Sequence, residues 1–239
     1  MKRVVALFLL IFLPLLVVPE PSEAEEHFSP IGKAYHATYI LYSDVQGLWG
    51  SAWILDTGKT RGTVVVTAAH CILNKKTGEL ITKNWWIWHP GWPKETKFRL
   101  KVNILGHDVK KDVAILSSPI YYNLPGLQLA KEPPLHCEEV AYVANGGGLI
   151  PHTKEIGNYL ATKHMKIPKV NPYPRDYDLF IARVMPGSSG SPMLNRNGHV
   201  ISMAVGYESF QGNPQNTQIC LANPLWYIKE TLQKYKIRF

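Results

Sequence analysis

The stretch MPGSSGSPM at residues 185–193 lies between two apolar runs, at residues 179–182 and 199–205. A serine flanked by glycines on a tight turn between strands can point its hydroxyl outward, while nearby backbone N–H groups stay unpaired and point the same way. Such a turn suits the nucleophile of an acyl-transfer reaction. Taken alone, the stretch is more typical of an ordinary hairpin loop, because Gly, Ser and Pro are the common turn residues.

Two stretches nearer the N-terminus favour the chemical interpretation. The predicted buried strand TVVV at residues 63–66 runs into TAAHC, which would hold the ring of His70 close to the core. Asp112 begins the apolar run DVAIL. A carboxylate at the mouth of such a strand is costly to bury unless it accepts hydrogen bonds, and an imidazole N–H is a suitable donor. The alternatives are a histidine with no role and a solvated turn aspartate.

The three stretches, with His70, Asp112 and Ser189 in that order, resemble the signature stretches of chymotrypsin-fold serine proteases. They are most similar to the bacterial branch that includes glutamyl endopeptidases and HtrA proteases, and the resemblance extends from about Tyr35 to the C-terminus. It implies a serine endopeptidase in which His70 is the base, Asp112 orients it and Ser189 attacks the substrate. The backbone N–H groups of Gly187 and Ser189 would then form the oxyanion hole.

The fold class predicted from the strand pattern is all-β. Short runs rich in Val, Ile, Tyr, Trp and Phe recur between Gly, Pro and Asn, which is typical of antiparallel strands. About six strands in each half predict two six-stranded antiparallel β-barrels, with a C-terminal α-helix at residues 224–235 docked on the second. The expected strands span residues 34–42, 50–56, 63–67, 85–88, 97–105 and 113–117, then 139–144, 159–167, 179–184, 200–205 and 217–221. We interpret the aromatic segment 84–93 as a half-buried strand and hairpin, and Asn145–Gly148 as a surface loop.

Residues 1–24 predict a secretory signal peptide. Lys2 and Arg3 precede an apolar run at residues 4–18, and small residues follow at a suitable cleavage point. We therefore expect a secreted or periplasmic protein with no stable membrane span after cleavage, and an uncleaved N-terminal anchor is the alternative. The expected organisation is a signal peptide at 1–24, an N-terminal barrel at 25–118, a linker at 119–134 and a C-terminal barrel with its helix at 135–239.

The formal net charge of +8 at pH 7 favours anionic surfaces, but the basic residues are scattered, so we expect no nucleic-acid partner. No metal spacing such as HExxH occurs, and we expect neither a metal nor a cofactor. Cys71, Cys137 and Cys220 make no CxxC pair, and they could form a Cys137–Cys220 bridge or be three buried small side chains. The family resemblance further implies that Cys71 is a free thiol, because no cysteine lies near residues 50–53.

The chain departs from the digestive enzymes of this family at Ser188, where their zymogens carry an aspartate that pairs with a newly freed N-terminal amine. Activation is therefore predicted not to need such an amine. Arg183 lies where the resemblance implies the base of the primary specificity pocket, and an inward guanidinium would favour an acidic substrate side chain. An outward, solvated Arg183 is the alternative. Val205 and Tyr207 are the other expected substrate contacts, with Tyr207 narrowing the pocket.

The expected partner is a protein or peptide substrate, and the sequence makes no prediction of oligomeric state. A rival function from another class is a catalytically inactive binding protein of the same fold, which uses its positive charge to adhere to anionic surfaces. An esterase without useful peptidase activity is the third possibility.

Overall fold

The computed structural model describes residues 29–58, 62–74, 77–93, 98–118, 120, 124–146, 150–168, 170–209 and 218–239. The expected signal peptide at residues 1–24 lies outside these described residues. Within them, no helix is both long and apolar enough to cross a bilayer.

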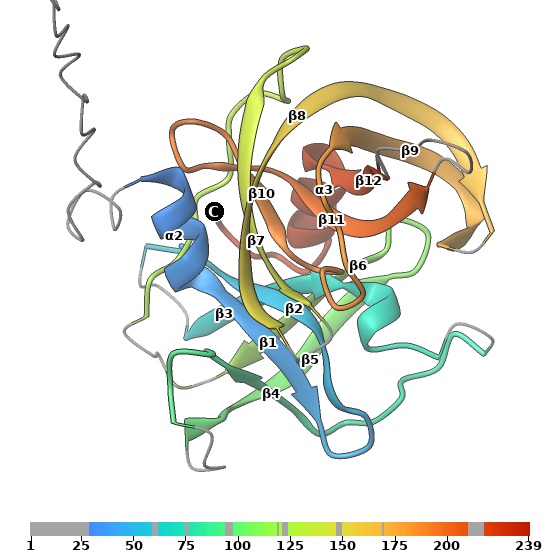
Figure 1. The fold of residues 1–239 in the computed structure, drawn as a ribbon. Helices are drawn as coiled ribbons and strands as arrows, with labels where there is room; N and C mark the ends of the chain where they lie inside the picture. The colour runs from blue at the N-terminus through green and yellow to red at the C-terminus, as the bar shows by residue number, and fades with distance from the viewer. Residues whose placement is uncertain are drawn as a thin grey trace, which may run out of the picture.

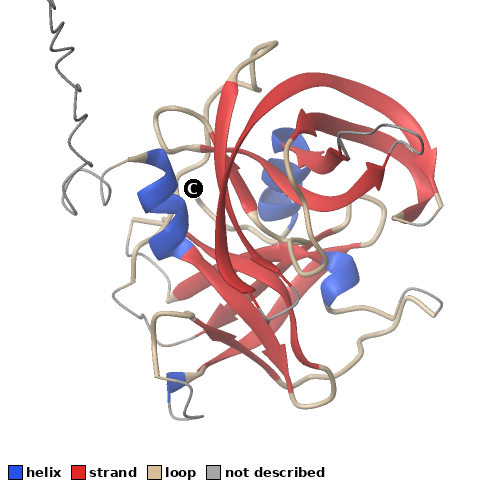
Figure 2. Cartoon of the chain, viewed as in Figure 1, coloured by secondary structure: helices blue, strands red, loops and turns tan. Residues whose placement is uncertain are grey.

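The described chain forms two closed six-stranded antiparallel barrels, one above the other in the view of Figures 1 and 2, as predicted. The first barrel has the strand order β1-β2-β3-β6-β5-β4 and the second β10-β11-β12-β9-β8-β7. The first contains β1 (Thr38–Ser43), β2 (Gly47–Leu55), β3 (Thr63–Ala68), β4 (Trp85–Trp88), β5 (Leu100–Asp108) and β6 (Val113–Ser118). The second contains β7 (Glu139–Gly146), β8 (Ile150–Ile167), β9 (Asn171–Ile181), β10 (Pro192–Leu194), β11 (Val200–Ser209) and β12 (Gln218–Pro224).

The two central strands of the first barrel explain why its fold was readable from the sequence. All six residues of β3 are buried, and the strand pairs with β2 on one side and β6 on the other. β-Branched side chains such as those of this run fit a pleated, buried surface. The aromatic strand β4 also matches its prediction, because Trp85, Ile87 and Trp88 are buried while Trp86 is half-buried.

The second barrel departs further from expectation. β8 and β9 form one long hairpin that arches over the upper barrel in Figure 1 and extends well beyond the predicted strands 159–167 and 179–184. The short strand β10 was not predicted, since it begins with a proline and has only three residues. The predicted surface loop Asn145–Gly148 is wrong for Asn145 and Gly146, which end β7 with Asn145 buried; residues 147–149 are outside the described chain.

A helix, α2 (Pro30–Ala37), replaces the start of the strand predicted at residues 34–42. Ser29 caps it by accepting a hydrogen bond from the Gly32 N–H at 3.0 Å, and the first helical residue is a proline. Although it precedes β1, α2 lies against β7, β8 and β10 of the second barrel. The segment therefore ties the beginning of the described chain to the C-terminal half.

The C-terminal helix α3 (Leu225–Lys234) is confirmed, and it contacts both barrels rather than the second alone. It packs on β6 as well as on β11 and β12, and Tyr235 just beyond it reaches β5. The Tyr235 hydroxyl donates to the His107 carbonyl oxygen at 2.9 Å and accepts from the His107 N–H at 3.1 Å. A Cβ at Gly106 would lie 2.0 Å from the Tyr235 ring, so only glycine allows this contact.

All three cysteines are free thiols. Cys71 and Cys220 are buried, whereas Cys137 is exposed. The structure therefore supports a free Cys71 but contradicts both the Cys137–Cys220 bridge and the interpretation of all three as buried small side chains.

Candidate active site

His70 sits on a short 3-10 turn, η1 (Ala69–Cys71), that follows β3 directly. The Ala69 N–H donates to the Asp112 carbonyl oxygen at 3.1 Å, which binds the turn to the start of β6. The His70 side chain is only 13% exposed. A rigid strand end and a backbone hydrogen bond therefore fix the direction of the imidazole.

Asp112 is held to His70 through both carboxylate oxygens. Oδ2 accepts from the His70 ring at Nδ1, 2.8 Å away, and Oδ1 accepts from the His70 backbone N–H, also at 2.8 Å. The residue has φ 55, in the left-handed region that few non-glycine residues adopt and that aspartate tolerates better than most. Its carbonyl oxygen also accepts from the Asn223 side-chain amide at 2.8 Å, so neighbouring elements hold this backbone in place.

The two side chains shift one another's protonation. Burial lowers the pKa of the His70 imidazole, but the Asp112 carboxylate outweighs it, and the net pKa lies above the usual value of 6.5. Burial likewise raises the pKa of the Asp112 carboxyl, yet the charge and hydrogen bonds of His70, helped by Arg175, bring it below 3.8. Asp112 is therefore an ionised carboxylate despite being 1% exposed.

Ser189 lies between β9 and β10, and its carbonyl oxygen is 3.7 Å from Cys71 Sγ. Residues 185–188 form a turn closed by the Ser188 N–H, which donates to the Met185 carbonyl oxygen at 3.0 Å. Gly187 has φ 95, as the third residue of a type II turn requires. Among the described residues, neither the Gly187 nor the Ser189 N–H has a hydrogen-bond partner. Both donors are thus available to an incoming oxygen.

The turn at residues 185–190, which carries Ser189, is bound to the first barrel through Ser51. The Ser51 hydroxyl donates to the Gly187 carbonyl oxygen at 2.9 Å and accepts from the Asn145 N–H and side-chain amide, each at 3.3 Å. The Ser51 N–H donates to the Ser189 carbonyl oxygen at 2.8 Å. A Cβ at Gly190 would lie 2.0 Å from the Ser51 carbonyl oxygen, so the close approach of the two barrels requires glycine there.

Ser188 is buried, with 1% exposure, and its hydroxyl accepts from the Met185 N–H at 3.2 Å. This neutral bond closes the same turn from its other side. The Ser189 hydroxyl itself donates to the Val205 carbonyl oxygen at a long 3.4 Å. In the described part of the chain no hydrogen bond joins it to His70, so the hydroxyl must rotate before it can pass its proton to the ring.

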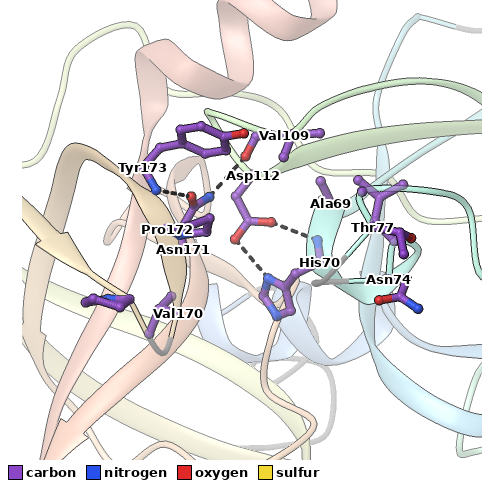
Figure 3. A pocket seen from close by; sticks show the side chains of 13 residues that line it. Ala69, His70, Asn74, Thr77, Val109, Asp112, Val170, Asn171, Pro172 and Tyr173 are labelled. Carbon is purple, nitrogen blue, oxygen red and sulfur yellow. Dashed lines mark hydrogen bonds and ion pairs between the residues drawn. The ribbon is translucent and has the colours of Figure 1, made fainter.

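Two cavities flank His70. One, of about 290 Å³, lies between the barrels, with Ala69, Leu73 and Asp112 on one side and, on the other, Pro168, Val170 and the first residues of β9 (Figure 3). In Figure 3 the imidazole lies at the edge of this cavity with Val170 and Tyr173 across from it. The other cavity, of about 570 Å³, lies over the first barrel beside Gln46 and Leu80.

The predicted substrate contacts divide into two kinds. The structure places Val205 at the Ser189 hydroxyl, although its side chain is buried and only its carbonyl oxygen faces the site. Tyr207, two residues further on, is 38% exposed. Arg183 is exposed and lines neither of the two cavities beside His70.

Sequence analysis missed several residues that hold the site, because they are distant in the chain and carry no motif. They are Ser51, Asn145, Asn171, Arg175 and Asn223. Asn171 donates to the Val109 carbonyl oxygen at 3.0 Å and so joins β9 to the turn that leads into Asp112. No group of three or more potential metal ligands occurs among the described residues.

Comparison with known proteins gives a family match and several similar folds. Residues 50–203 match the trypsin-like peptidase domain, a span that contains His70, Asp112 and Ser189. No protein with a curated description matches the chain in sequence.

The similar solved structures include several proteases. The Rv3671c protease from M. tuberculosis, in its active form, is 20% identical, with a TM-score of 0.67 over 92% of this chain and 90% of that one. The HtrA-type protease AlgW with a tripeptide is 21% identical, with a TM-score of 0.66 over 86% of this chain and 62% of that one. The serine endoprotease from Yersinia pestis is 19% identical, with a TM-score of 0.64 over 91% and 68%. At these identities the likeness shows a shared fold.

Proposed function

Because the chain belongs to the trypsin-like peptidase domain family, that of serine proteases, we propose that it hydrolyses internal peptide bonds with His70, Asp112 and Ser189 as its catalytic triad. The observation that carries the proposal is the buried pair of His70 and Asp112, joined by two hydrogen bonds of 2.8 Å beside a glycine-flanked serine. This pair gives the imidazole a fixed tautomer, with Nδ1 donating to the carboxylate and Nε2 free to accept a proton.

In the first half of the reaction, Ser189 Oγ attacks the substrate carbonyl carbon as His70 Nε2 takes the hydroxyl proton. Asp112 stabilises the imidazolium that forms and keeps the ring oriented. The scissile C–N bond then breaks as His70 returns the proton to the leaving amine, which leaves an acyl-enzyme. In the second half, water repeats the attack and Ser189 regains its proton.

The developing oxyanion would be bound by the N–H groups of Gly187 and Ser189, which lack other partners in the described chain. Losing one such donor costs about 2.7 to 4 kcal/mol of transition-state stabilisation in comparable enzymes. The hydrogen bonds of Ser51 and Ser188 to this turn hold it in place in advance.

The substrate would cross His70 as an extended peptide, with side chains in the two cavities on either side. The cavity between the barrels has a mixed lining, with apolar side chains such as Leu73 and Val170 beside polar ones such as Asn74, and would accept a substrate residue that has both apolar and polar atoms. The exposed Arg183 favours the outward alternative over an acidic primary specificity.

Activation would need no freed N-terminal amine, because the neutral Ser188 hydroxyl bonds the Met185 N–H where relatives use a charged carboxylate. Export through the segment at residues 1–24 is also part of the proposal, and it rests on the sequence pattern. A fully active enzyme with extra residues at its N-terminus would support amine-independent activation, and an inactive one would oppose it.

A fluorophosphonate probe tests the triad directly, since it reacts with an activated serine. We expect labelling of the folded wild type and none of Ser189→Ala, together with cleavage of a denatured protein mixture by the wild type only. Folded protein that is not labelled would favour the inactive binding protein. Labelling with ester cleavage but no peptide cleavage would favour the esterase.

A further inference from the structure

Arg175, on β9, has a buried guanidinium with no hydrogen-bond partner in the described chain. The residue is 3% exposed, and none of its three guanidinium nitrogens has a hydrogen-bond partner among the described residues. Burying a charge without such partners is costly, and replacement by an apolar side chain is often neutral or stabilising. A guanidinium in this position therefore needs an explanation other than fold stability.

Its surroundings point to the triad. The nearest carboxylate atom is Asp112 Oδ2, 3.7 Å from Arg175 Nη2, which is too long for a hydrogen bond but close for a charge interaction. On another side the guanidinium lies 4.4 Å from the centre of the Tyr177 ring. Because Asp112 Oδ2 is also the atom that accepts from His70 Nδ1, the imidazole and the guanidinium share one carboxylate oxygen.

The other charged and titratable groups near Asp112 do not replace Arg175. Burial raises the pKa of the Tyr177 phenol, and the buried Cys71 side chain lies next to the His70 ring. On the side of α3, the charges form pairs at the surface: Lys111 with Glu230 at 2.6 Å and Lys234 with Asp108 at 3.8 Å.

We propose that Arg175 is a positioning residue of the triad, whose guanidinium interacts with the Asp112 carboxylate and offsets part of its charge, so that Asp112 favours the protonated form of His70 less strongly than it would alone. The inference rests on the proposed function. Asp112 raises the pKa of the His70 imidazole, and a guanidinium close to the same carboxylate oxygen opposes part of that rise, which favours the neutral imidazole that a general base requires.

The physical consequence is a change in pH dependence. Replacing the guanidinium by a neutral group exposes His70 to the full carboxylate charge, which raises the pKa of the imidazole. At an effective dielectric constant near 20, a charge a few ångströms away moves such a pKa by about one unit or more. The acidic limb of the rate profile should therefore move to higher pH.

The experiment compares Arg175→Gln, Arg175→Lys and Arg196→Gln in the full chain. Arg196 is exposed, so its change removes the same charge from the surface. We measure kcat/KM for a peptide substrate against pH and normalise to fluorophosphonate-labelled sites. The lower pKa of the profile should rise by about one unit in Arg175→Gln and by less than about 0.3 in the two controls.

A folded Arg175→Gln with the wild-type profile would overturn the inference. So would an equal shift in Arg196→Gln, because the effect would then be one of net charge. If Arg175→Gln does not fold, Arg175→Met takes its place, because an apolar side chain of similar volume is often tolerated where a charge was buried. The same rise in the lower pKa of the profile supports the offset by Arg175, and an unchanged profile contradicts it. A wild type that fluorophosphonate does not label contradicts the proposed function instead.

Discussion

Each barrel buries one aspartate, and the pKa values of the two carboxyl groups are shifted in opposite directions from the usual 3.8. Asp112 in the first barrel is 1% exposed and Asp178 in the second is 0% exposed. Asp112 receives two hydrogen bonds from His70 and lies near a guanidinium, so it stays ionised. For Asp178, burial raises the pKa from 3.8 to about 6, since only the hydroxyls of Thr162 and Ser202 face it.

The hydrogen-bond pattern agrees with a protonated Asp178. The Ser202 hydroxyl lies within hydrogen-bond reach of Asp178 Oδ2 and 2.8 Å from the Ile201 carbonyl oxygen. A hydroxyl has one proton and cannot donate to both oxygens. If Asp178 carries its own proton, it donates to Ser202, which then donates to Ile201. Burial without a cationic partner thus raises the pKa of a carboxyl, and a cationic partner lowers it.

The largest difference between the two barrels should appear when the buried aspartate of each is replaced by asparagine. Asp112→Asn should lower kcat by about 10⁴, because the amide favours the wrong imidazole tautomer and does not stabilise the imidazolium. Asp178→Asn is the matched control and should retain kcat. Equal losses in both variants, measured with a peptide substrate at pH 7.5, would mean that the two carboxyl groups do not differ in role.

The next effect concerns stability. In native protein Asp178 keeps its proton up to about pH 6, whereas the unfolded chain loses it near 3.8. The unfolded state therefore binds fewer protons across this window, and the free energy of unfolding falls as pH rises, by up to about 3 kcal/mol. Asp178→Asn should remove this contribution and be more stable at pH 7, with its amide donating to Ser202. Urea unfolding at pH 4 to 8 measures the free energy of unfolding of the wild type and of Asp178→Asn. The same pH dependence in both proteins would contradict the prediction.

A smaller effect tests whether hydrogen bonds between uncharged groups suffice to hold the turn at residues 185–190. Ser188→Ala leaves the N–H of the half-buried Met185 without its acceptor, at a cost of about 0.5–1.5 kcal/mol, and should lower kcat by up to about tenfold. Ser191→Ala is the control, because the Ser191 hydroxyl is equally buried but has no partner in the described chain. Steady-state kinetics measures kcat of both variants. A loss in Ser191→Ala as large as that in Ser188→Ala would refute a specific role for the Ser188 hydroxyl.

The smallest effect belongs to His89 in the first barrel, which is held neutral. Burial lowers the pKa of its imidazole, Nδ1 accepts from the Gly91 N–H, and the other nitrogen faces the Tyr35 carbonyl oxygen. Below pH 6.5 the unfolded chain binds a proton that the native ring resists, so this contribution to stability is lost as pH falls. His89→Asn keeps an acceptor for Gly91 and should weaken that loss, as thermal unfolding at pH 5 and 7 would show. If the stability of His89→Asn depends on pH as that of the wild type does, His89 does not make this contribution.

Local signals carried much of the prediction in the first barrel. The β-branched run of β3 leads straight into His70, and Asp112 leads straight into β6, so two thirds of the proposed triad lie at the ends of strands that the sequence shows plainly. The helix α2 also had its signals, Ser29 and Pro30 at its start, which the aromatic and β-branched residues after Ala34 outweighed.

The second barrel was less readable because its partners are distant in sequence. Arg175 and Tyr177 lie on the face of β9 turned toward the first barrel, whereas Asp178 and Phe180 lie on the other face. Because buried side chains lie on both faces of its central part, no regular polar alternation marks the strand. The contacts of Ser51 with Gly187, and of Asn223 with Asp112, join residues more than 100 positions apart.

By itself the sequence determined two β-barrels, a nucleophile turn, and a histidine and an aspartate at strand ends, because strand periodicity and turn chemistry are local. It also contains two nearly equivalent patterns, DVAIL at Asp112 and DLFI at Asp178. Only the tertiary structure decided between them. It brought His70 and Arg175 to the first carboxyl and two hydroxyls to the second, and the charge of a buried acid depends on the partners that folding supplies.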